Sequence, residues 1–499
     1  MGNVLTDIVC FIPEVALGTL ILIFLTGAVF LKKEIQEGVL LGKLMFGIFA
    51  GIGGLVILQS LHPLYIFNDL FVSNTYTTCI KFLVLSITIC VYAFSFSSLK
   101  IEKILGIELY IFVLMALLGM FVMIGAYDFM SFYLGMELQN SALYILIAFK
   151  KESLKNNEAA VKYFILGVVA SGIFLFGASL LYGAVGSLNF QNICNIFVSS
   201  HVSYVRWGGC IGLLFIIASF LFKLALVPFH MWAPDVYEGI PLPIVGFLAL
   251  IPKMVILSII LHLWILLFPI KTIPMELDAL KIFPPLLKVA SLLSILVGTF
   301  GAFGQLNIKR FIAYSGISHM GFIVLGIVLG NYNGMYAAII YLLSYLIMGV
   351  GFFSCLCALR YPQGFSRLGI IKDLSDLKGL SKTHPSMSFM IALLMISFAG
   401  LPPFIGFFSK LYLLLSFIES GFIGVAIFVG LLSIIAAVYY LRIIKYLYFD
   451  ETEVFLDVVC PFSFFVPVLI SLAGTVFFFL YSKPLFWCVS FVMKALLEN

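Results

Sequence analysis

Charged side chains are scarce in this chain of 499 residues, and apolar side chains dominate it. Only 10% of the residues are Asp, Glu, Lys or Arg, whereas 63% are hydrophobic. A soluble domain carries about 25% charged residues, because its surface must face water. The low charge therefore excludes a water-soluble globular protein and indicates a surface that faces lipid.

Sequence motifs for nucleic acids, metals and cofactors are missing as well. The net charge of +5 is spread thinly, without the basic patch that nucleic acid requires. No Cys-x-x-Cys spacing occurs, and Cys355 and Cys357 lie too close together for a zinc pair. Gly51 and Gly53 lie inside an apolar segment, not in the strand–turn–helix context of a nucleotide loop. We expect no nucleic-acid partner, no metal site and no cofactor in this chain.

Long apolar segments recur along the whole sequence. A bilayer crossing needs about 20 apolar residues. By that criterion spans are predicted near residues 9–31, 39–58, 78–97, 104–124, 127–149, 162–185, 208–232, 242–268, 284–303, 312–329, 334–359, 386–418, 422–447 and 461–481. We expect an all-α membrane protein with about fourteen transmembrane helices, forming a single polytopic domain over residues 1–499.

Basic residues gather in the loops on one predicted side, which the positive-inside rule places in the cytoplasm or its equivalent. That side carries Lys32, Lys33, Lys43, Lys100, Lys103, Lys150, Lys151, Lys155, Lys309, Arg310, Arg360, Arg367, Lys372, Lys378, Lys382, Arg442 and Lys445, and the other carries Arg206, Lys271, Lys281, Lys288, Lys483 and Lys494. An even number of spans then puts both termini on the outer side.

Four charged residues lie deep in the predicted spans, and they are Glu137, Lys223, Lys253 and Lys410. A charge at mid-membrane costs about 2.5–3.5 kcal/mol on insertion scales. Burial favours the uncharged form of each group, so each could take up and release a proton. Static ion pairs are the alternative, but one glutamate cannot neutralise three lysines. The pattern favours a proton or cation carrier.

Four further charges lie closer to the ends of predicted spans. Glu14, Glu108 and Asp128 are within about two turns of a span end, and Lys81 is at a span edge. The side chains of Glu14, Glu108 and Asp128 could reach the interface, whereas Lys81 is left out of the count of loop charges.

Two predicted spans are interrupted by proline. Pro228 follows Lys223 in the seventh span, and Pro402 and Pro403 precede Lys410 in the twelfth. Proline breaks or kinks a helix, and broken spans at membrane depth are typical of transport sites. An offset of five spans reverses direction in the membrane. We therefore expect two inverted repeats, spans 4–8 over residues 104–268 and spans 9–13 over residues 284–447.

Polar residues at helical spacing from these charges are candidate relay residues. On the fifth span, Tyr144 shares the face of Glu137. His230 follows Lys223 by two turns and could relay protons or pack near the membrane edge. Further candidates on the tenth and eleventh spans are Ser315, Ser318, His319, Tyr341 and Tyr345. A lone hydroxyl is more often a packing contact, but together they could line a wet path from Lys253 to Lys410.

Four runs of unusual residues resemble a known family. Residues 222–239 read FKLALVPFHMWAPDVYEG, which is similar to the antiporter-like membrane subunits of NADH–quinone oxidoreductase, respiratory complex I. The runs ELQNSALY at 137–144, EAAVKYFILG at 158–167 and KRFIAYSGISH at 309–319 favour the subunit N branch of that family. The resemblance covers essentially the whole chain. The chain departs from the family pattern after Gly239, where it has Ile240 and Pro241.

The resemblance implies fourteen helices, two inverted repeats and a hydrated axis in which Glu137, Lys223, Lys253 and Lys410 carry protons. Our own mechanistic hypothesis is that Glu137 and Lys223 form an ion pair. Flavin, iron–sulfur clusters, NADH and quinone would then be held by partner subunits. The partners would be other membrane subunits of complex I, including neighbouring antiporter-like subunits, within a lipid bilayer. The length of the chain and the fourteen spans favour a bacterial inner membrane over the inner membrane of an organelle.

Two other classes of function remain open from the sequence. One is a subunit of a multisubunit sodium/proton antiporter, whose members share helices 4–13 with the same family. The other is a structural membrane subunit with an inactive channel, against which the intact set of four buried charges argues.

Overall fold

The computed structural model describes residues 4–30, 39–59, 63–102, 104–199, 203–267, 282–362, 371–452, 454–458 and 462–497. The basic residues Lys32, Lys33, Lys103, Lys271, Lys281 and Arg367 lie outside the described residues. Within the described ranges, ten helices are long and apolar enough to cross a membrane. The helical membrane fold that the composition predicts is therefore confirmed.

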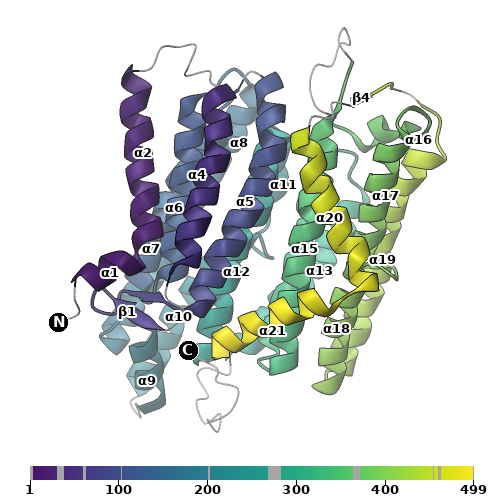
Figure 1. The fold of residues 1–499 in the computed structure, drawn as a ribbon. Helices are drawn as coiled ribbons and strands as arrows, with labels where there is room; N and C mark the ends of the chain where they lie inside the picture. The colour runs from purple at the N-terminus through teal and green to yellow at the C-terminus, as the bar shows by residue number, and fades with distance from the viewer. Residues whose placement is uncertain are drawn as a thin grey trace.

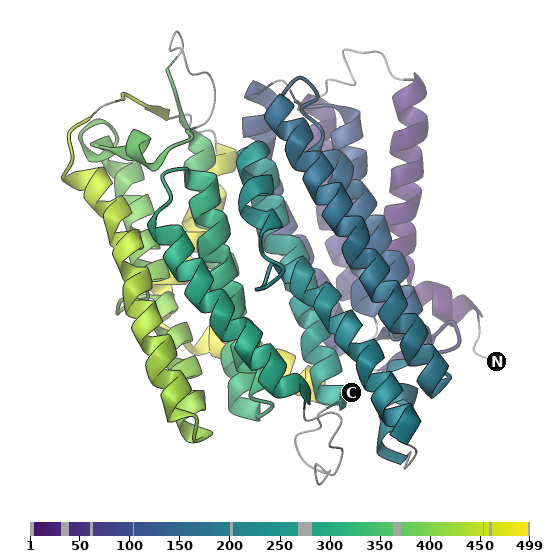
Figure 2. The same ribbon diagram turned by 180° about the vertical axis from the view of Figure 1, so that it is seen from behind.

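The helices form a bundle in which most run between the same two ends (Figure 1; Figure 2). The N-terminal part contains α1 (Val4–Cys10), α2 (Ile12–Phe30), α4 (Val39–Ile57), the antiparallel hairpin β1 (Leu64–Ile66) and β2 (Phe71–Ser73), and α5 (Thr75–Ile101). The next helices are α6 (Ile107–Gly125), α7 (Phe129–Ile147), α8 (Leu154–Val185), α9 (Phe190–Ser199), α10 (Ser203–Leu224), α11 (Trp232–Gly239) and α12 (Leu242–Leu267).

The second half of the chain is also mostly helical. It contains α13 (Phe283–Phe303), α14 (Ile308–Val328), α15 (Tyr332–Ala358), α17 (Pro385–Ala399), α18 (Ile405–Glu419) and α19 (Ile423–Tyr448). Short elements connect them: β3 (Leu359–Arg360), η2 (Leu374–Leu377), α16 (Leu380–Thr383) and β4 (Asp457–Val458), with β3 paired to β4. The chain closes with α20 (Phe462–Leu480) and α21 (Lys483–Leu497).

The two ends of the bundle carry different short elements. One end holds α16 and β4, and the other holds α1, α9 and α21 (Figure 1). We call them the α16 end and the α21 end. The first and the last described helices thus lie at the same end, as an even number of crossings requires.

Helix starts are set by capping side chains more than by the edges of the apolar segments. α8 begins at Leu154, well before the predicted span at 162–185, because the Ser153 side chain caps it and accepts a hydrogen bond from the Asn156 amide. α5 begins at Thr75 behind a capping box formed by Asn74 and Thr77. The extra turns are polar or charged, so the apolar criterion could not detect them.

Both proline-containing segments break their helices, as predicted. α10 ends at Leu224, and Ala225 takes a left-handed conformation with φ of 57°. α17 ends at Ala399, and Gly400 has φ of 80°. In each case the last turn closes with the same pair of backbone bonds: Ala225 to Phe222 and Leu226 to Leu221 at the first break, and Gly400 to Ser397 and Leu401 to Ile396 at the second. This pattern is the Schellman motif, which satisfies the last carbonyls of a helix.

Glycine allows two helix pairs to approach closely. A Cβ at Gly119 of α6 would lie 2.7 Å from the Gly135 carbonyl oxygen of α7. A Cβ at Gly177 of α8 would lie 2.6 Å from the Gly212 carbonyl oxygen of α10. Close backbone contact through small residues is how helices associate inside a membrane, where lipid is as apolar as the side chains. These contacts bring α7, α8 and α10 together around the first buried lysine.

The central helices of the bundle are α12, α14 and α15. Most of their span residues are buried, 94%, 94% and 89% of the most apolar window, whereas α2 and α19 are buried over only 28% and 33%. The helices that carry Lys253, His319, Tyr341 and Tyr345 are therefore shielded from lipid on all sides.

Glu14 does not reach the interface, contrary to expectation, because it is buried in the bundle together with Lys81. They form an ion pair of 2.6 Å between α2 and α5, and their side chains are 0% and 2% exposed. The ammonium of Lys81 also lies 6.0 Å from the ring centroid of Phe121 in α6. The prediction for Glu14 was wrong because it used only the distance of the residue from the span end, and the surrounding helices cover that end. The pair joins the N-terminal helices to α6.

We predict that Lys81→Met lowers the thermal stability of the protein in detergent, since it leaves the buried Glu14 carboxylate unpaired. Loss of one partner of a buried pair costs about 3–5 kcal/mol, whereas replacing both by apolar groups is often neutral. The double variant Glu14→Leu/Lys81→Met should therefore recover most of the lost stability. A double variant less stable than Lys81→Met would contradict this account.

Candidate functional site

Lys223 and Glu137 are joined through Asn140 and not by a direct ion pair. The Lys223 ammonium donates to Oδ1 of Asn140 at 2.6 Å, and Nδ2 of Asn140 donates to Oε1 of Glu137 at 3.2 Å. Ser171 of α8 lies 3.4 Å from the same Asn140 nitrogen. The expected Glu137–Lys223 ion pair is thus wrong in its geometry. An amide that accepts on one side and donates on the other links the two charges while keeping them apart.

A small polar cavity lies beside Lys223. Its volume is about 10 Å³, and it is lined by Met136, Gln139, Asn140, Tyr163, Lys223, Trp232, Leu248, Pro252 and Ile256. Oε1 of Gln139 is buried and has no hydrogen-bond partner among the described residues. A site of this size with convergent polar atoms suits about one water molecule. Pro252, which lines the cavity, directly precedes Lys253 in α12.

The first helix break positions Lys223. The lysine is in the last turn of α10, where the negative end of the helix dipole favours a cation. The indole of Trp232 donates to the Phe222 carbonyl at 2.9 Å, and the Val227 amide donates to Oγ of Ser294 at 2.8 Å. These bonds satisfy backbone groups that the break releases, so the irregular chain is tolerated within the bundle.

Lys253 is buried on α12 without a hydrogen-bond partner among the described residues. Its side chain is 2% exposed, and its ammonium lies 5.8 Å from the ring centroid of Tyr237. The ammonium and the Tyr345 hydroxyl lie 3.6 and 3.5 Å from where a Cβ would stand at Gly316 of α14. An unpaired buried ammonium is costly. The charged Lys253 ammonium is therefore costly to bury. The Tyr345 hydroxyl lies near the same point on α14, at Gly316.

His319 connects the helices of the second half. Its Nδ1 lies 3.0 Å from the Tyr341 hydroxyl of α15, and its Nε2 lies 2.9 Å from the Tyr440 hydroxyl of α19. Its ring is also 5.2 Å from that of Tyr345 and 5.5 Å from that of Phe398, centroid to centroid. Each tautomer of the imidazole donates to one tyrosine and accepts from the other. The group can thus reverse the direction of its hydrogen bonds.

Lys410 lies at the second helix break and binds the backbone. Its ammonium donates to the carbonyl oxygens of Phe398 at 3.1 Å and of Ala399 at 2.8 Å. These are the last residues of α17, whose C-terminal dipole favours a cation. The Phe398 ring in turn packs on Tyr440, with ring centroids 5.6 Å apart. Lys410 is therefore held by a helix end, and the His319 group is its neighbour.

A charged group at the α16 end joins the two halves of the chain. Lys309 of α14 donates to the carbonyls of Glu238 and Ile240 at the end of α11, at 3.2 and 2.6 Å. Arg310 pairs with the Glu238 carboxylate at 3.1 Å and lies 3.6 Å from that of Asp235. These residues belong to two of the runs that carry the family resemblance. Their contacts hold α11, and with it Trp232 and Tyr237, against α14.

Four of the candidate relay residues are less well placed than the sequence suggests. His230 lies half-buried in the break after Lys223, and its Nδ1 has no partner among the described residues. Tyr144 packs against Tyr163 with rings 5.4 Å apart, and its hydroxyl is also unpartnered there. Ser315 and Ser318 donate to backbone carbonyls of their own helix. Tyr341 and Tyr345 both contact His319.

Three residues of the site were not selected from the sequence. Asn140 follows Glu137 by about one helical turn, and it makes the contact between Glu137 and Lys223. Tyr440 of α19 and Tyr237 of α11 approach the relay from distant segments. A tyrosine in an apolar span gives no sequence signal of its own. Among the described residues no cluster of three or more His, Cys, Asp or Glu side chains could hold a metal ion.

Known proteins are similar to this chain in sequence over most of its length. Residues 126–436 match the model of the family described as NADH:quinone oxidoreductase/Mrp antiporter, transmembrane. The chain is 36% identical to NADH-quinone oxidoreductase subunit N of Parvibaculum lavamentivorans over 489 residues, which covers 97% of each sequence.

Solved structures share the fold at lower sequence identity. A chain of respiratory complex I from Thermus thermophilus superposes with a TM-score of 0.76 at 24% identity, covering 97% of this chain and 99% of that one. A chain of the Mrp complex from Dietzia sp. superposes with a TM-score of 0.81 at 18% identity, covering 99% and 98%.

We predict that Gly400→Ala disturbs the second break and destabilises the protein in detergent. Gly400 has a left-handed backbone that alanine disfavours by about 1–2 kcal/mol. A Cβ there would also stand 2.9 Å from the Lys410 ammonium. The matched control is Gly430→Ala on α19, where nothing lies within 4 Å and stability should be kept or raised. Equal melting temperatures for the two variants would refute the prediction.

Proposed function

The chain belongs to the NADH:quinone oxidoreductase/Mrp antiporter transmembrane family, and on that premise we propose how its buried residues move protons. It is a proton-translocating membrane subunit of an NADH-quinone oxidoreductase. The observation that supports our assignment of the relay is the row of partly compensated lysines across the centre of the bundle. Lys223 has an amide partner, Lys253 has none among the described residues, and Lys410 has two carbonyls.

The relay begins at Glu137 and Lys223. Asn140 transmits the charge state of one to the other, because it bonds both. When Glu137 is charged, its field and the amide favour an ammonium at Lys223. When Glu137 takes up a proton, that support weakens, and Lys223 can release its proton to a water in the adjoining cavity. This is a switch in population by local electrostatics.

Lys253 passes the proton laterally and Lys410 is the terminal site. The proton reaches Lys253 through the cavity beside Pro252, and leaves it toward Tyr345 and the His319 group. His319 accepts it on one nitrogen and donates from the other. Lys410 receives it next to Phe398 and exchanges it with the neighbouring subunit or the far side of the membrane. The remaining candidate relay residues, which would assist rather than carry the main path, are His230, Tyr144, Ser315 and Ser318.

The two broken helices support an inverted repeat of about five spans within about fourteen crossings. We assign the first repeat to residues 104–268 and the second to residues 284–447. The matching Schellman closures after Leu224 and Ala399, in helices five crossings apart, support this assignment. So do the paired close contacts of α6 with α7 and of α13 with α14.

The partners follow from the family. NADH oxidation and quinone reduction take place in other subunits, which hold the flavin and the iron–sulfur clusters, and this chain holds no redox centre. Its direct partners are neighbouring antiporter-like subunits in a bacterial inner membrane, with the α21 end and both termini on the outer side. The alternative, a subunit of a sodium/proton antiporter, has only the Mrp structural likeness at 18% identity in its favour.

We predict that Lys253→Arg assembles but pumps poorly, and that Lys253→Ala behaves much like it. Arginine keeps its charge at every accessible pH, so it cannot release a proton. Lys223→Arg should be milder if Lys223 mainly answers the charge of Glu137, and Glu137→Gln should lower both pumping and quinone reductase activity. Proton translocation per electron in inverted vesicles measures the effect, after assembly is verified on native gels. Normal pumping by assembled Lys253→Arg would exclude Lys253 as a protonation site.

We predict that the α16 end faces the cytoplasm, since the basic loops gather there. Cysteines placed at Ser153 and Ser381 should resist a membrane-impermeant maleimide in intact cells and react with it in inverted vesicles. The unsubstituted protein measures the background from its own cysteines. The opposite labelling pattern would reverse the topology.

A further inference from the structure

Among the described residues, the aromatic ring that faces the ammonium of Lys253 belongs to Tyr237 of α11. The ammonium lies 5.8 Å from the ring centroid, within the distance of about 6 Å over which a cation is attracted to the face of a ring. Both side chains are buried, and Tyr237 is only 1% exposed. Such an attraction is stronger away from water, because the cation has no solvent to compete for it.

No carboxylate of the described residues pairs with Lys253, and its ammonium has no hydrogen-bond partner among them. The acids of α6 and α7 lie elsewhere, since Glu108 is exposed in the first turn of α6 and Glu137 bonds Asn140. The other titratable groups that the neighbouring helices direct toward α12 are Tyr345 of α15, His319 of α14, Lys223 of α10 and Tyr76 of α5. These groups are neutral or positive near neutral pH. The ring of Tyr237 is therefore the compensation that remains for the charge of Lys253.

The position of Tyr237 is fixed from the α16 end. α11 has only eight residues, and isolated helices of that length are marginal in stability. Lys309 of α14 donates to the carbonyls of Glu238 and Ile240, which follow Tyr237 closely, at 3.2 and 2.6 Å. A cation at the end of a helix stabilises it by interaction with the last carbonyls. Lys309 thus holds the segment that carries the ring.

α14 bounds the Lys253 site as well as holding α11. Gly316 follows Lys309 by two helical turns and lies on the same face of α14. A Cβ at Gly316 would stand 3.6 Å from the Lys253 ammonium. The same helix therefore borders the ammonium with one residue and holds the ring segment with another, so Lys309 can set the distance between them.

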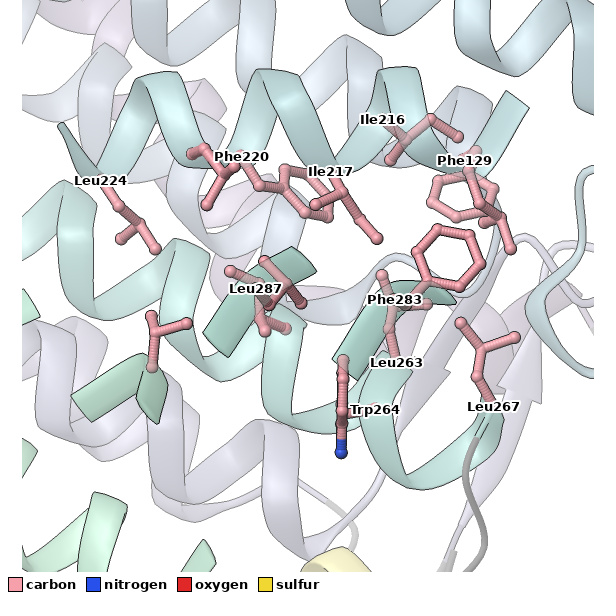
Figure 3. A pocket seen from close by; sticks show the side chains of 14 residues that line it. Phe129, Ile216, Ile217, Phe220, Leu224, Leu263, Trp264, Leu267, Phe283 and Leu287 are labelled. Atoms are coloured by element: carbon pink, nitrogen blue, oxygen red, sulfur yellow. The ribbon is translucent and has the colours of Figure 1, made fainter. Parts of the chain in front are cut away.

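Other buried rings of the bundle pack against apolar side chains. Figure 3 shows Phe129 and Phe220 at a cavity whose lining is hydrocarbon apart from the indole nitrogen of Trp264. Phe129 is as deeply buried as Tyr237, with 1% exposed, and its ring centroid lies 4.7 Å from that of Phe190. Phe129 is therefore a matched control for the loss of a buried ring that faces no ammonium.

We propose that the ring of Tyr237 stabilises the ammonium form of Lys253, and that Lys309 is the positioning residue that holds the ring in place. A contact at the α16 end then sets how firmly a lysine in the centre of the bundle binds its proton. The proposal rests on the proton-carrying role proposed for Lys253. It adds a role for two residues that lie outside the relay.

The first test separates the ring of Tyr237 from its hydroxyl. In Tyr237→Leu the Lys253 ammonium should lose its proton more readily, so proton translocation per electron should decline at lower pH than in wild type. We expect the midpoint of the alkaline decline to move down by about one pH unit, which is tenfold weaker proton binding or about 1.4 kcal/mol. Tyr237→Phe keeps the ring and should keep the wild-type profile, and so should Phe129→Leu.

The second test concerns the positioning role of Lys309. Lys309→Met should move the alkaline decline in the same direction as Tyr237→Leu, and Lys309→Arg, which keeps donors for the two carbonyls, should restore it. The control is Lys155→Met, because Lys155 lies 3.7 Å from the Glu238 carboxylate but is 78% exposed. If Lys309→Met does not assemble on native gels, Lys309→Gln keeps an amide donor and should show a smaller shift in the same direction.

The outcomes separate this proposal from the relay itself. An unchanged profile in assembled Tyr237→Leu, or an equal shift in Tyr237→Phe, would overturn the role of the ring. An unchanged profile in the assembled Lys309 variant would overturn the positioning role. All of these variants retain Lys253, so a failure of the relay, seen as normal pumping by Lys253→Arg, is a different result.

Discussion

An ammonium group inside a membrane must find compensation within the protein, and the arrangement of the central helices depends on this constraint. Lys410 is compensated by two carbonyls at the end of α17, and Lys223 by an amide that also bonds a carboxylate. Lys253 has no hydrogen-bond partner among the described residues. The three ammonium groups are therefore compensated by the protein to different degrees. The relay proposed above runs through these three differently compensated positions.

The helix breaks are what make this compensation available. An unbroken helix uses its carbonyls internally and offers nothing to a buried cation. At the second break, the end of α17 turns its last carbonyls toward α18, and Gly400 leaves room for the Lys410 side chain. At the first break, Trp232 and Ser294 satisfy groups freed from the backbone, so that α10 can end in mid-bundle. Proline thus shapes the site because it prevents the neighbouring backbone from continuing the helix and its internal hydrogen bonds.

The sequence was sufficient to predict the helical membrane fold and both helix breaks. Periodicity and proline are local signals, and these features depend on them. Glu14 and Lys81 show the limit, because their burial depends on which helices cover them and not on their distance from a span end. Asn140 shows another, since a bridging amide is recognised only when both of its partners are in place. Tyr440 and Tyr237 come from segments far apart in the chain.

The position of the Lys410 ammonium at the end of α17 affects the contact between α17 and α18. Its ammonium is the only described charge that bonds the last two carbonyls of α17, and it is carried by α18. The attraction between a cation and a helix C-terminus is worth about 0.3–2 kcal/mol, and it disappears when the cation loses its proton. Loss of the proton from Lys410 would therefore weaken the contact between α18 and the end of α17, and its return would restore that contact. In the proposed relay, the proton occupancy of Lys410 would therefore set how firmly α18 is held to the end of α17.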